Sequence, residues 1–241
     1  EKDIPRIAIL GDSITYSGQW ATWIQAGLES SPEYKNAYIV NFGLPSETAS
    51  GLSEEGHAGG SFPRPCIHDS LDSILSKFKP NLILCCYGIN DGIYQPLDQN
   101  RTNAFKNGIT KLRREAKKAH AEIIFITPPL YQADHAEKQK GNYDQVMDAY
   151  SKWLVEQKAS GWNVIDIRPG LKKQIEERKQ KDPEFIYAGD GVHPGDEGHF
   201  LIARAIWPVL RDILQIRTPF PSRAHYNGVI SQQDVRKLTW L

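Results

Sequence analysis

Four short polar motifs in this 241-residue chain contain the side chains that nucleophilic catalysis requires. In chain order they are Gly11-Asp12-Ser13, Asn41-Phe42-Gly43-Leu44-Pro45-Ser46, Gly88-Ile89-Asn90-Asp91-Gly92 and Asp190-Gly191-Val192-His193-Pro194. A serine hydroxyl is a poor nucleophile near neutral pH until a base removes its proton. A histidine can be that base, and a nearby carboxylate can fix its tautomer and stabilise the imidazolium. We therefore interpret Ser13 as a candidate nucleophile, His193 as its base and Asp190 as the orienting acid.

The same motifs offer hydrogen-bond donors for the oxyanion that forms during acyl transfer. The candidates are the backbone N–H groups of Ser13 and Gly43 and the side-chain amide of Asn90. Gly43 suits this role because a residue without Cβ lets the backbone approach a substrate closely. Each residue also has a structural alternative: Asp12 or Ser13 could cap a helix, as could His193, while Asn90 could be a turn residue and Gly43 a helix-loop glycine. Their occurrence in order, each at a predicted strand end or in the final loop, favours catalysis.

Five short apolar runs predict the strands that would position these motifs. They cover residues 6–10, 38–42, 82–87, 123–127 and 164–167, and they do not alternate between polar and apolar. Such runs are typical of strands buried on both faces. Segments with helical spacing lie between and after them, at 19–30, 71–78, 102–119, 143–158, 171–179 and about 194–214. This alternation predicts an α/β fold in which helices cover both faces of a parallel sheet through right-handed crossovers.

The order of the strands decides whether the polar motifs meet. In a five-stranded sheet of order 2-1-3-4-5, strands one and three flank the point where the order reverses, and ligands bind at the carboxyl ends there. Ser13 and Asn90 would then face each other across one crevice, with Gly43 beside them. The Asp-x-x-His spacing brings Asp190 within reach of one ring nitrogen of His193 and leaves the other nitrogen for a serine hydroxyl.

These motifs resemble those of the SGNH hydrolase superfamily, also called the GDSL esterases, over residues 6–214. The family's first block is similar to Gly11-Asp12-Ser13-Ile14, in which isoleucine replaces the usual leucine; later blocks match Gly43, residues 88–91 and residues 190–193. The resemblance implies a flavodoxin-like, three-layer α/β/α sandwich and a metal-free Ser-His-Asp ester hydrolase without a cofactor. It implies Ser13, His193 and Asp190 as the triad, with Gly43 and Asn90 as oxyanion donors. The other common serine-hydrolase motif, Gly-x-Ser-x-Gly, is absent from the sequence.

We expect one catalytic domain over residues 1–214 and a tail at 215–241. Pro219 and Pro221 are typical of a segment that crosses a surface, and the apolar residues at the end suggest a natural protein that continues. The chain starts without methionine and shows no signal peptide, which would fit an export signal already removed. We therefore expect a secreted or periplasmic protein, although removal of a tag would fit equally well.

The composition limits the classes of partner. The 29 Lys and Arg residues balance the 29 Asp and Glu residues, so no net field attracts nucleic acid or an anionic membrane. The basic clusters at 111–118 and 176–181 contain acids at helical spacing and predict solvated helix faces. With 40% hydrophobic residues and no long apolar run, we expect a substantial core and no membrane insertion. The three cysteines form no zinc or disulfide pattern, and we expect Cys85 and Cys86 in the core.

The surroundings of the motifs indicate the class of substrate. Asp12, Tyr16 and Tyr94 lie within a few residues of the candidate nucleophile or oxyanion donor and are candidate substrate-binding residues. Aromatic faces beside polar loops suit a sugar better than a long acyl chain. Trp20 and Trp23, three residues apart on a predicted helix, are interpreted as core residues instead.

The segment 50–65 leaves the sheet after the second strand, and its length and glycine content predict a wall or lid over the crevice. Arg64 near its end could bind a substrate carboxylate or pair with an acid of the protein. We expect His57 to be a surface residue rather than a ligand. A variable loop without a role is the alternative for this segment.

We expect an esterase that removes a short acyl group, acetyl foremost, from a small acylated substrate such as a sugar or glycan. A lysophospholipase, a thioesterase or an arylesterase with the same triad is the enzymatic alternative, and profiling of acyl-chain length would separate these. A non-catalytic carbohydrate-binding module on the same fold is the alternative from another class. The intact Ser13, Asn90, Asp190 and His193 argue against that module.

Overall fold

The structure, a computed structural model, describes residues 4–132 and 142–238, with side chains up to Ile230. The main elements are β1 (Arg6–Gly11), α1 (Ser13–Tyr16), α2 (Gln19–Glu29), β2 (Tyr38–Asn41), α3 (Ile67–Ser73), β3 (Leu82–Cys86), α4 (Gln99–Lys118), β4 (Glu122–Ile126), α5 (Asp144–Glu156), β5 (Asn163–Ile165), α6 (Arg168–Lys181), α7 (Asp196–Ile213) and α8 (Arg223–Leu238). A π-helical turn at Ile74–Phe78 extends α3. The five strands and the helices α2 and α4 to α7 lie within a few residues of the predicted ranges.

The five strands form one parallel sheet of order β2-β1-β3-β4-β5, as predicted. Ile9 in β1 pairs with Asn41 of β2 on one side and with Leu84 of β3 on the other. Strand β3 is buried throughout, and β1 and β4 are buried except at their first residues. Because the strands are parallel, their carboxyl ends meet at one edge, and the first three polar motifs follow β1, β2 and β3 at that edge.

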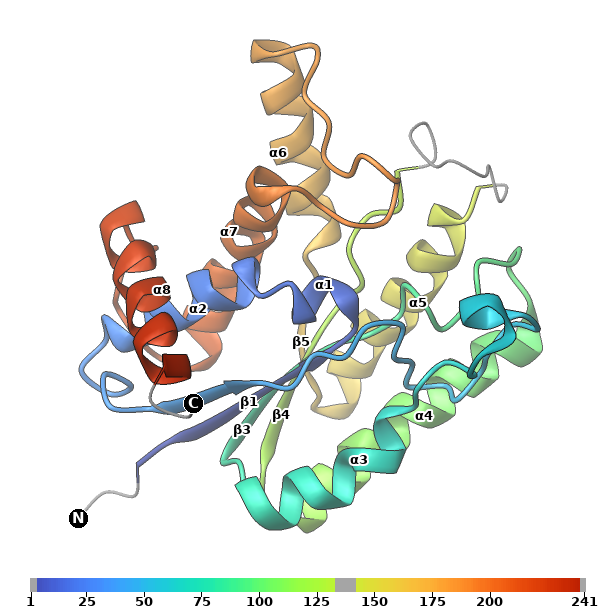
Figure 1. Cartoon of the computed structure of the whole chain (residues 1–241), viewed down its shortest axis with the longest axis horizontal. Helices are drawn as coiled ribbons and strands as arrows, with labels where there is room; N and C mark the ends of the chain where they lie inside the picture. Colours follow the sequence, from blue (N-terminus) through green and yellow to red (C-terminus); the bar gives the residue numbers. More distant parts are fainter. Residues whose placement is uncertain (1–3, 133–141, 239–241) are drawn as a thin grey trace.

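Right-handed crossovers distribute the helices over the two faces of the sheet. The chain moves outward from β1 to β2 through α2 and then back past β1 to β3 through α3, so α2 and α3 lie on opposite faces. Helices α4 and α5 continue in the second direction and join α3. Helix α7 returns to the first face and packs against α2. Figure 1 shows α2, α7 and α8 on one side of the strands and α3, α4 and α5 on the other, which makes the predicted three-layer sandwich.

Strand β2 differs from the prediction that every strand is buried on both faces. It lies at the edge of the sheet, and its residues are exposed or only half-buried. Tyr38 at the start of β2 packs against Phe78, at the end of the π-helical turn after α3, with the ring centroids 5.7 Å apart. An apolar run of this length does not encode whether a strand has one neighbour or two.

The core holds the residues that the sequence assigned to it. Trp20, Trp23, Cys85 and Cys86 are all buried among the apolar side chains between sheet and helices. The three cysteines are free thiols, with Cys66 half-buried in a loop. The core prediction is therefore confirmed for these residues.

The segment expected to be a surface tail contains a helix, α8, that the sequence did not predict. Trp23 stacks on Phe220 and Tyr226, with ring centroids 5.5 Å and 4.2 Å apart. Tyr226 and Val229 are buried, and α8 packs against α2 (Figure 1). The helix has few apolar residues of its own, and the ring that covers it comes from the other end of the chain. Its hydrophobic pattern was therefore too weak to reveal it.

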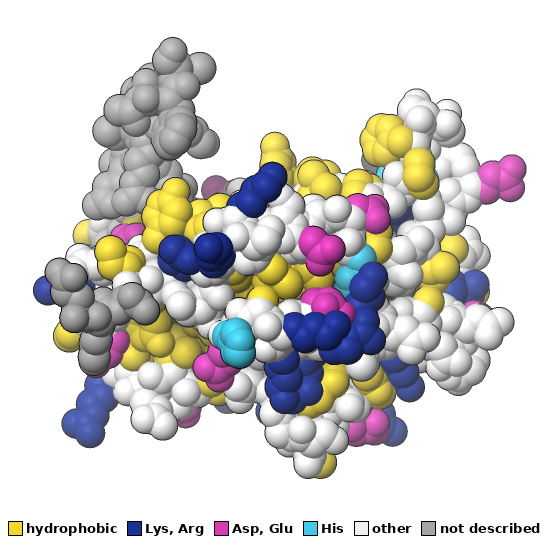
Figure 2. All heavy atoms as spheres, turned by 90° about the horizontal axis from the view of Figure 1, so that it is seen from below, with side chains coloured by type: hydrophobic (Ala, Val, Ile, Leu, Met, Phe, Trp, Pro, Cys, Tyr) yellow, Lys and Arg dark blue, Asp and Glu magenta, His cyan; other side chains and the backbone are white. Residues whose placement is uncertain are grey.

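Charges on the surface are mixed. In α4, Glu115 lies 2.8 Å from Arg114 and 3.1 Å from Lys118, as expected for a solvated helix face. On the face shown in Figure 2, basic side chains gather below the centre with acidic and apolar side chains next to them. In the part of the chain that the structure describes, no helix is both long enough and apolar enough to cross a membrane.

Candidate active site

Ser13 lies directly after β1, at the first position of the short helix α1. Gly11 permits the turn, because a Cβ there would come within 2.1 Å of the Thr15 hydroxyl. The side chain of Asp12 caps α1 by accepting a hydrogen bond from the Ile14 N–H at 2.9 Å. Strand, glycine and cap together fix the Ser13 backbone at the carboxyl edge of the sheet.

The side chains of Ser13, His193 and Asp190 form one continuous hydrogen-bonded chain. Ser13 Oγ lies 2.8 Å from His193 Nε2, and His193 Nδ1 lies 2.6 Å from Asp190 Oδ2. One ring nitrogen therefore faces a carboxylate that can orient it, while the other faces the hydroxyl. This is the arrangement needed for a histidine to remove a serine proton. The fold thus brings together three residues from opposite ends of the chain.

Backbone hydrogen bonds hold the acid in the loop before α7. Asp190 Oδ1 accepts the N–H of Val192 at 2.8 Å and that of His193 at 2.7 Å. Partial burial opposes ionisation, but the hydrogen bonds from the His193 ring and these two N–H groups outweigh it and lower the pKa of Asp190. The carboxylate is therefore charged at neutral pH. The side chains of His193 and Asp190 are 52% and 48% exposed, so a substrate can reach them from solvent.

Asn90 lies in the loop that follows β3. Gly11 at the end of β1 pairs with Cys86 at the end of β3, so this loop begins beside the serine motif. The Asn90 side chain is buried, and its Nδ2 donates to the backbone carbonyl of Glu47 at 3.2 Å. Its Oδ1 accepts the hydroxyl of Tyr94 at 3.1 Å. An amide nitrogen carries two hydrogens, so one N–H remains for a substrate oxygen.

Gly43 does not offer the free backbone N–H that the sequence-based interpretation requires. Its N–H donates to Asn41 Oδ1 at 2.8 Å, and Asn41 Nδ2 donates to the Thr15 carbonyl at 2.7 Å. The glycine is required by packing, because a Cβ would come within 2.4 Å of the Tyr16 backbone nitrogen. The structure therefore does not support Gly43 as an oxyanion donor. The missing Cβ serves a close contact between two backbone segments, not an approach to substrate.

A backbone donor without a protein partner lies three residues further on, at Ser46. The Glu47 N–H donates to the Leu44 carbonyl at 3.1 Å and closes a turn with Pro45 and Ser46 at its centre. Ser46 has a φ of 66°, and proline followed by a positive φ is typical of a type II turn. The Ser46 N–H donates to no residue that the structure describes. Pro45 indicates this turn in the sequence. Only the fold shows that the turn lies next to Asn90, whose amide donates to the carbonyl of Glu47, the residue after Ser46.

Two of the four candidate substrate-binding residues are used by the fold itself. Asp12 is buried as the cap of α1. Arg64 is also buried, and its guanidinium pairs with Glu54 through two contacts of 2.6 Å, Nε to Oε2 and Nη2 to Oε1. Pairing with an acid was the alternative that the sequence left open for Arg64.

The two candidate tyrosines differ in accessibility. Tyr16, in α1, is 63% exposed and remains free to contact a substrate. Tyr94 is largely enclosed: its ring stacks on Tyr143 with centroids 5.0 Å apart, and its hydroxyl contacts Asn90. Tyr94 is therefore placed to support the Asn90 amide.

Three buried carboxyl groups lie near this part of the site, and only one of them, Asp12, was a candidate residue. Burial raises the pKa of Asp12 and of Glu47 to about 7, and the charge of Asp91 adds to both shifts. Burial also raises the pKa of Asp91, to about 6. Asp91 Oδ1 accepts the N–H groups of Ala49 at 2.9 Å and Ser50 at 2.7 Å. These bonds fix the chain just after the Ser46 turn. Among residues 4–132 and 142–238, no cluster of His, Cys, Asp or Glu could hold a metal ion.

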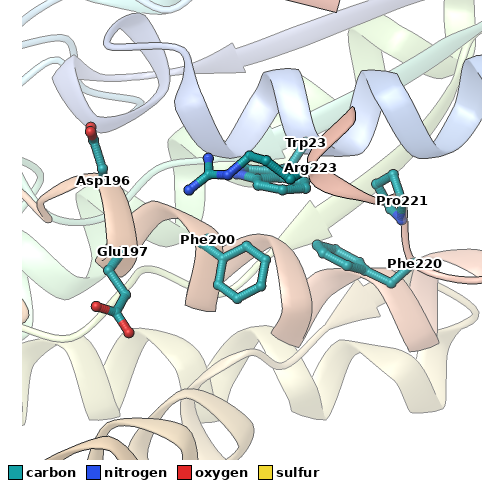
Figure 3. A pocket seen from close by; sticks show the side chains of 7 residues that line it. All are labelled: Trp23, Asp196, Glu197, Phe200, Phe220, Pro221 and Arg223. Carbon is teal, nitrogen blue, oxygen red and sulfur yellow. The ribbon is translucent and has the colours of Figure 1, made fainter. Parts of the chain in front are cut away.

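A separate pocket of about 470 Å³ lies between α2, α7 and the start of α8. Three aromatic rings line it, with two carboxylates at one end; the lining residues are Trp23, Asp196, Glu197, Phe200, Phe220, Pro221 and Arg223 (Figure 3). The Arg223 guanidinium lies over the Trp23 ring, 5.2 Å from its centroid. None of the candidate catalytic residues lines this pocket. Phe220, Pro221 and Arg223 of the segment expected to be a tail complete it.

Comparison with known proteins places this geometry in context. The sequence matches the model of the GDSL-like lipase/acylhydrolase family over residues 9–201. A search among curated proteins found no match.

Solved structures share the fold at low sequence identity. A gut microbial diltiazem-metabolizing enzyme has a TM-score of 0.68 and 19% identity over 87% of this chain, which spans only 47% of that enzyme's length. A catalytic mutant of an acetylxylan esterase from Geobacillus stearothermophilus has a TM-score of 0.62 and 18% identity, covering 89% of this chain and 97% of the esterase. An alpha/beta hydrolase from the metagenome of Lake Arreo, Spain, has a TM-score of 0.62 and 18% identity, with coverages of 85% and 94%.

Proposed function

We propose that this chain, which belongs to the GDSL-like lipase/acylhydrolase family, is a serine esterase that removes short acyl groups, acetyl foremost, from a carbohydrate. Membership in that family makes it a carboxylic ester hydrolase. The observation that carries the proposed serine mechanism is the hydrogen-bonded chain from Ser13 Oγ through His193 to Asp190, with contacts of 2.8 Å and 2.6 Å.

In the first half of the reaction, Ser13 Oγ attacks the carbonyl carbon of the ester while its proton passes to His193 Nε2. The carbonyl oxygen becomes an oxyanion. When the tetrahedral intermediate collapses, the bond to the alcohol oxygen breaks and His193 returns the proton to that oxygen. The sugar alcohol leaves, and the acyl group remains on Ser13. Asp190 stabilises the imidazolium formed in between, since hydrogen bonds keep its own carboxylate ionised.

The second half of the reaction repeats these proton transfers with water. His193 Nε2 takes a proton from water as its oxygen attacks the acyl carbon, and a second oxyanion forms. Collapse of this intermediate breaks the bond to Ser13 Oγ, which receives the proton from His193. The products are the free acid and the starting enzyme.

Three N–H donors are proposed for the oxyanion. They are the Ser13 backbone N–H, the remaining Nδ2 hydrogen of Asn90 and the Ser46 backbone N–H in place of that of Gly43. Ser13 and Ser46 each have a backbone N–H that bonds to none of the described residues. Fixed donors of this kind stabilise the developing charge without reorganising during the reaction.

The substrate class rests on the surroundings of Ser13. Tyr16, with an exposed ring, lies three residues after the nucleophile in α1, and the polar segment 51–65 follows the second strand. An aromatic face beside hydrogen-bonding loops suits a sugar. The acetylxylan esterase that shares the fold over nearly its whole length supports the same choice.

Two measurements test this proposal. A fluorophosphonate should label Ser13, as located by mass spectrometry, and Ser13→Ala should remove both the label and the activity. Hydrolysis of p-nitrophenyl esters should be fastest with acetate and decline with chain length, and acetylated oligosaccharides should release acetate. A preference for long acyl chains would favour the lysophospholipase or thioesterase alternative. An unlabelled Ser13 in an active enzyme would overturn the assignment of the nucleophile.

A further inference from the structure

Tyr94 makes a hydrogen bond whose direction can be assigned from its surroundings. The Asn90 carboxamide contacts the Glu47 carbonyl at 3.2 Å at one end and the Tyr94 hydroxyl at 3.1 Å at the other. A carbonyl can only accept, so the Asn90 nitrogen must face Glu47 and the Asn90 oxygen must face Tyr94. The Tyr94 hydroxyl is therefore the donor. The carboxamide is held at both ends, and one N–H is left over.

The backbone that delivers this hydroxyl is in an unfavourable conformation. Ile93 and Tyr94 have φ values of 48° and 53°, so two consecutive non-glycine residues occupy the left-handed region. This region is costly for any side chain and most of all for a β-branched one such as Ile93. Conformations of this kind persist where the surrounding structure enforces them, and they cluster at functional sites. The strained pair begins three residues after Asn90.

Contacts with Tyr143 and Arg64 hold the Tyr94 ring in place. The ring stacks on Tyr143, with an interplanar angle of 29°, and the Tyr143 hydroxyl is anchored on the Ile89 carbonyl at 2.9 Å. The Arg64 guanidinium lies 5.4 Å from the Tyr94 ring centroid and is itself fixed by Glu54. Burial raises the pKa of the Tyr94 hydroxyl, so it remains a donor at every pH at which the enzyme would work.

We propose that Tyr94 is a positioning residue that aims the free N–H of Asn90 at the oxyanion, an inference that rests on the proposed esterase function. Its hydroxyl prevents rotation of the carboxamide. By accepting this hydrogen bond, Oδ1 also withdraws electron density from Nδ2 and strengthens the remaining N–H as a donor. Tyr94 acts through Asn90 and need not touch the substrate.

This role differs from the substrate-binding role that the sequence indicated for Tyr94, and one variant separates them. Tyr94→Phe keeps the stacked ring and removes only the donor. With p-nitrophenyl acetate, we expect kcat to fall about 3- to 10-fold, the equivalent of one hydrogen bond, at unchanged KM. Tyr131→Phe is the matched control, because its ring lies in the same aromatic cluster, 6.4 Å from Tyr94, and its hydroxyl bonds to no described residue. A rise in KM at constant kcat would overturn the proposal and restore substrate binding.

A double-mutant cycle tests whether Tyr94 acts through Asn90. In the background of Asn90→Ala, removal of the Tyr94 hydroxyl should have no further effect on kcat, because the amide it positions is gone. Additive losses would overturn the proposal. Unfolding by urea should show that Tyr94→Phe remains folded under the assay conditions.

The rate of fluorophosphonate labelling separates this inference from the proposed function. Phosphonylation of Ser13 also places negative charge on an oxygen at the oxyanion site, so Tyr94→Phe should slow it by a similar factor whether or not acetylated sugars are substrates. A parent enzyme that is labelled but releases no acetate would refute the proposed substrate only. Equal labelling rates in parent and Tyr94→Phe would refute the role of Tyr94. A parent that is neither labelled nor active would refute both.

Discussion

His199 Nε2 lies 3.1 Å from Ser17 Oγ, so a second serine–histidine contact stands beside the pair formed by Ser13 and His193. Ser17 caps the end of α1, the helix that begins at Ser13, and His199 lies in the first turns of α7, just after His193. The contact therefore ties the helix of the nucleophile to the helix that follows the base. It lacks an orienting acid, because His199 Nδ1 is buried without a hydrogen-bond partner among the described residues.

This buried histidine predicts a loss of stability in acid. Burial lowers the pKa of His199 to about 4, whereas the unfolded chain binds the proton near pH 6.5. Between these values the unfolded state holds more protons, so the free energy of unfolding falls as the pH is lowered. Between pH 7 and pH 4.5, we expect the free energy of unfolding to fall by about 2 kcal/mol less in His199→Gln than in the parent. Urea unfolding at each pH measures this, with the exposed His225→Gln as control. Parallel pH profiles in parent and H199Q would contradict the prediction.

Glu47 predicts the opposite dependence on pH. Its pKa is raised to about 7 in the folded state from 4.5, so the folded state holds more protons between these values. Its contribution to stability is complete below pH 4.5 and is lost as the pH rises to 7. In the parent, the Tyr87 hydroxyl donates a hydrogen bond to Glu47 Oε2 at 2.5 Å. A glutamine can accept the same hydrogen bond but carries no charge. We expect Glu47→Gln to be about 1–3 kcal/mol more stable than the parent at pH 8 and no more stable at pH 4.5. Glu33→Gln on the surface is the control, and an advantage independent of pH would refute the assignment.

Ser13 and His193 should act as a unit. In serine hydrolases the loss of nucleophile or base costs on the order of 10⁴-fold or more in kcat, and the losses are far from additive. We expect Ser13→Ala combined with His193→Ala to be little worse than either change alone, and Asp190→Ala to cost less. Steady-state kinetics on an activated acetate ester measures all four variants. Multiplicative losses would mean that the hydrogen bond between Ser13 and His193 is not used in catalysis.

Much of the fold could be predicted because it depends on patterns within short segments. Runs of apolar residues marked all five strands, and the right-handed crossover rule then constrained the faces on which the helices lie. What could not be predicted depends on partners distant in sequence. Among the described strands β2 pairs with β1 alone, which makes it an edge strand, and the Tyr226 ring of α8 packs on Trp23. Neither fact is encoded in the segment concerned.

The candidate site shows the same division. Residue type and order were enough to identify Ser13, His193 and Asp190 as candidates, and the fold brings these three into contact. Gly43 was interpreted as a donor because glycine permits close approach, but the approaching group is the backbone at Tyr16. A sequence shows that a residue lacks Cβ without showing what fills the space.

Asn41 separates the packing role of Gly43 from a catalytic one. Its side chain bridges the Gly43 N–H and the Thr15 carbonyl. We expect Asn41→Ala to lower the free energy of unfolding by about 1–2 kcal/mol, as loss of such hydrogen bonds does, with kcat per folded molecule unchanged. Ser46→Gly should also leave kcat unchanged, because the proposed donor there is the backbone N–H. If Asn41→Ala raised kcat, the released Gly43 N–H would be acting on the oxyanion after all.

The loop at 51–65 contains an outer part and an anchor, and these should affect different kinetic constants. Phe62 is 56% exposed, and a Cβ at Gly56, Gly59 or Gly60 would have no neighbour within 4 Å, so this part stands open to solvent. Arg64 belongs to the anchor: it pairs with Glu54, reaches the Ser46 carbonyl at 3.4 Å and covers the Tyr94 ring.

A sugar distant from the ester can contact the outer part, whereas a p-nitrophenyl acetate is too small to do so. We expect Phe62→Ala to raise KM about 2- to 10-fold on an acetylated oligosaccharide, as for the loss of one aromatic contact, and to leave p-nitrophenyl acetate unaffected. Arg64→Ala should instead lower kcat by a similar factor on both substrates, because it loosens the Ser46 turn and Tyr94 together. Kinetics of the two variants on the two substrates decide between these roles. Equal effects of Phe62→Ala on both substrates would mean that the outer part also supports the catalytic centre, and its role in specificity would be refuted.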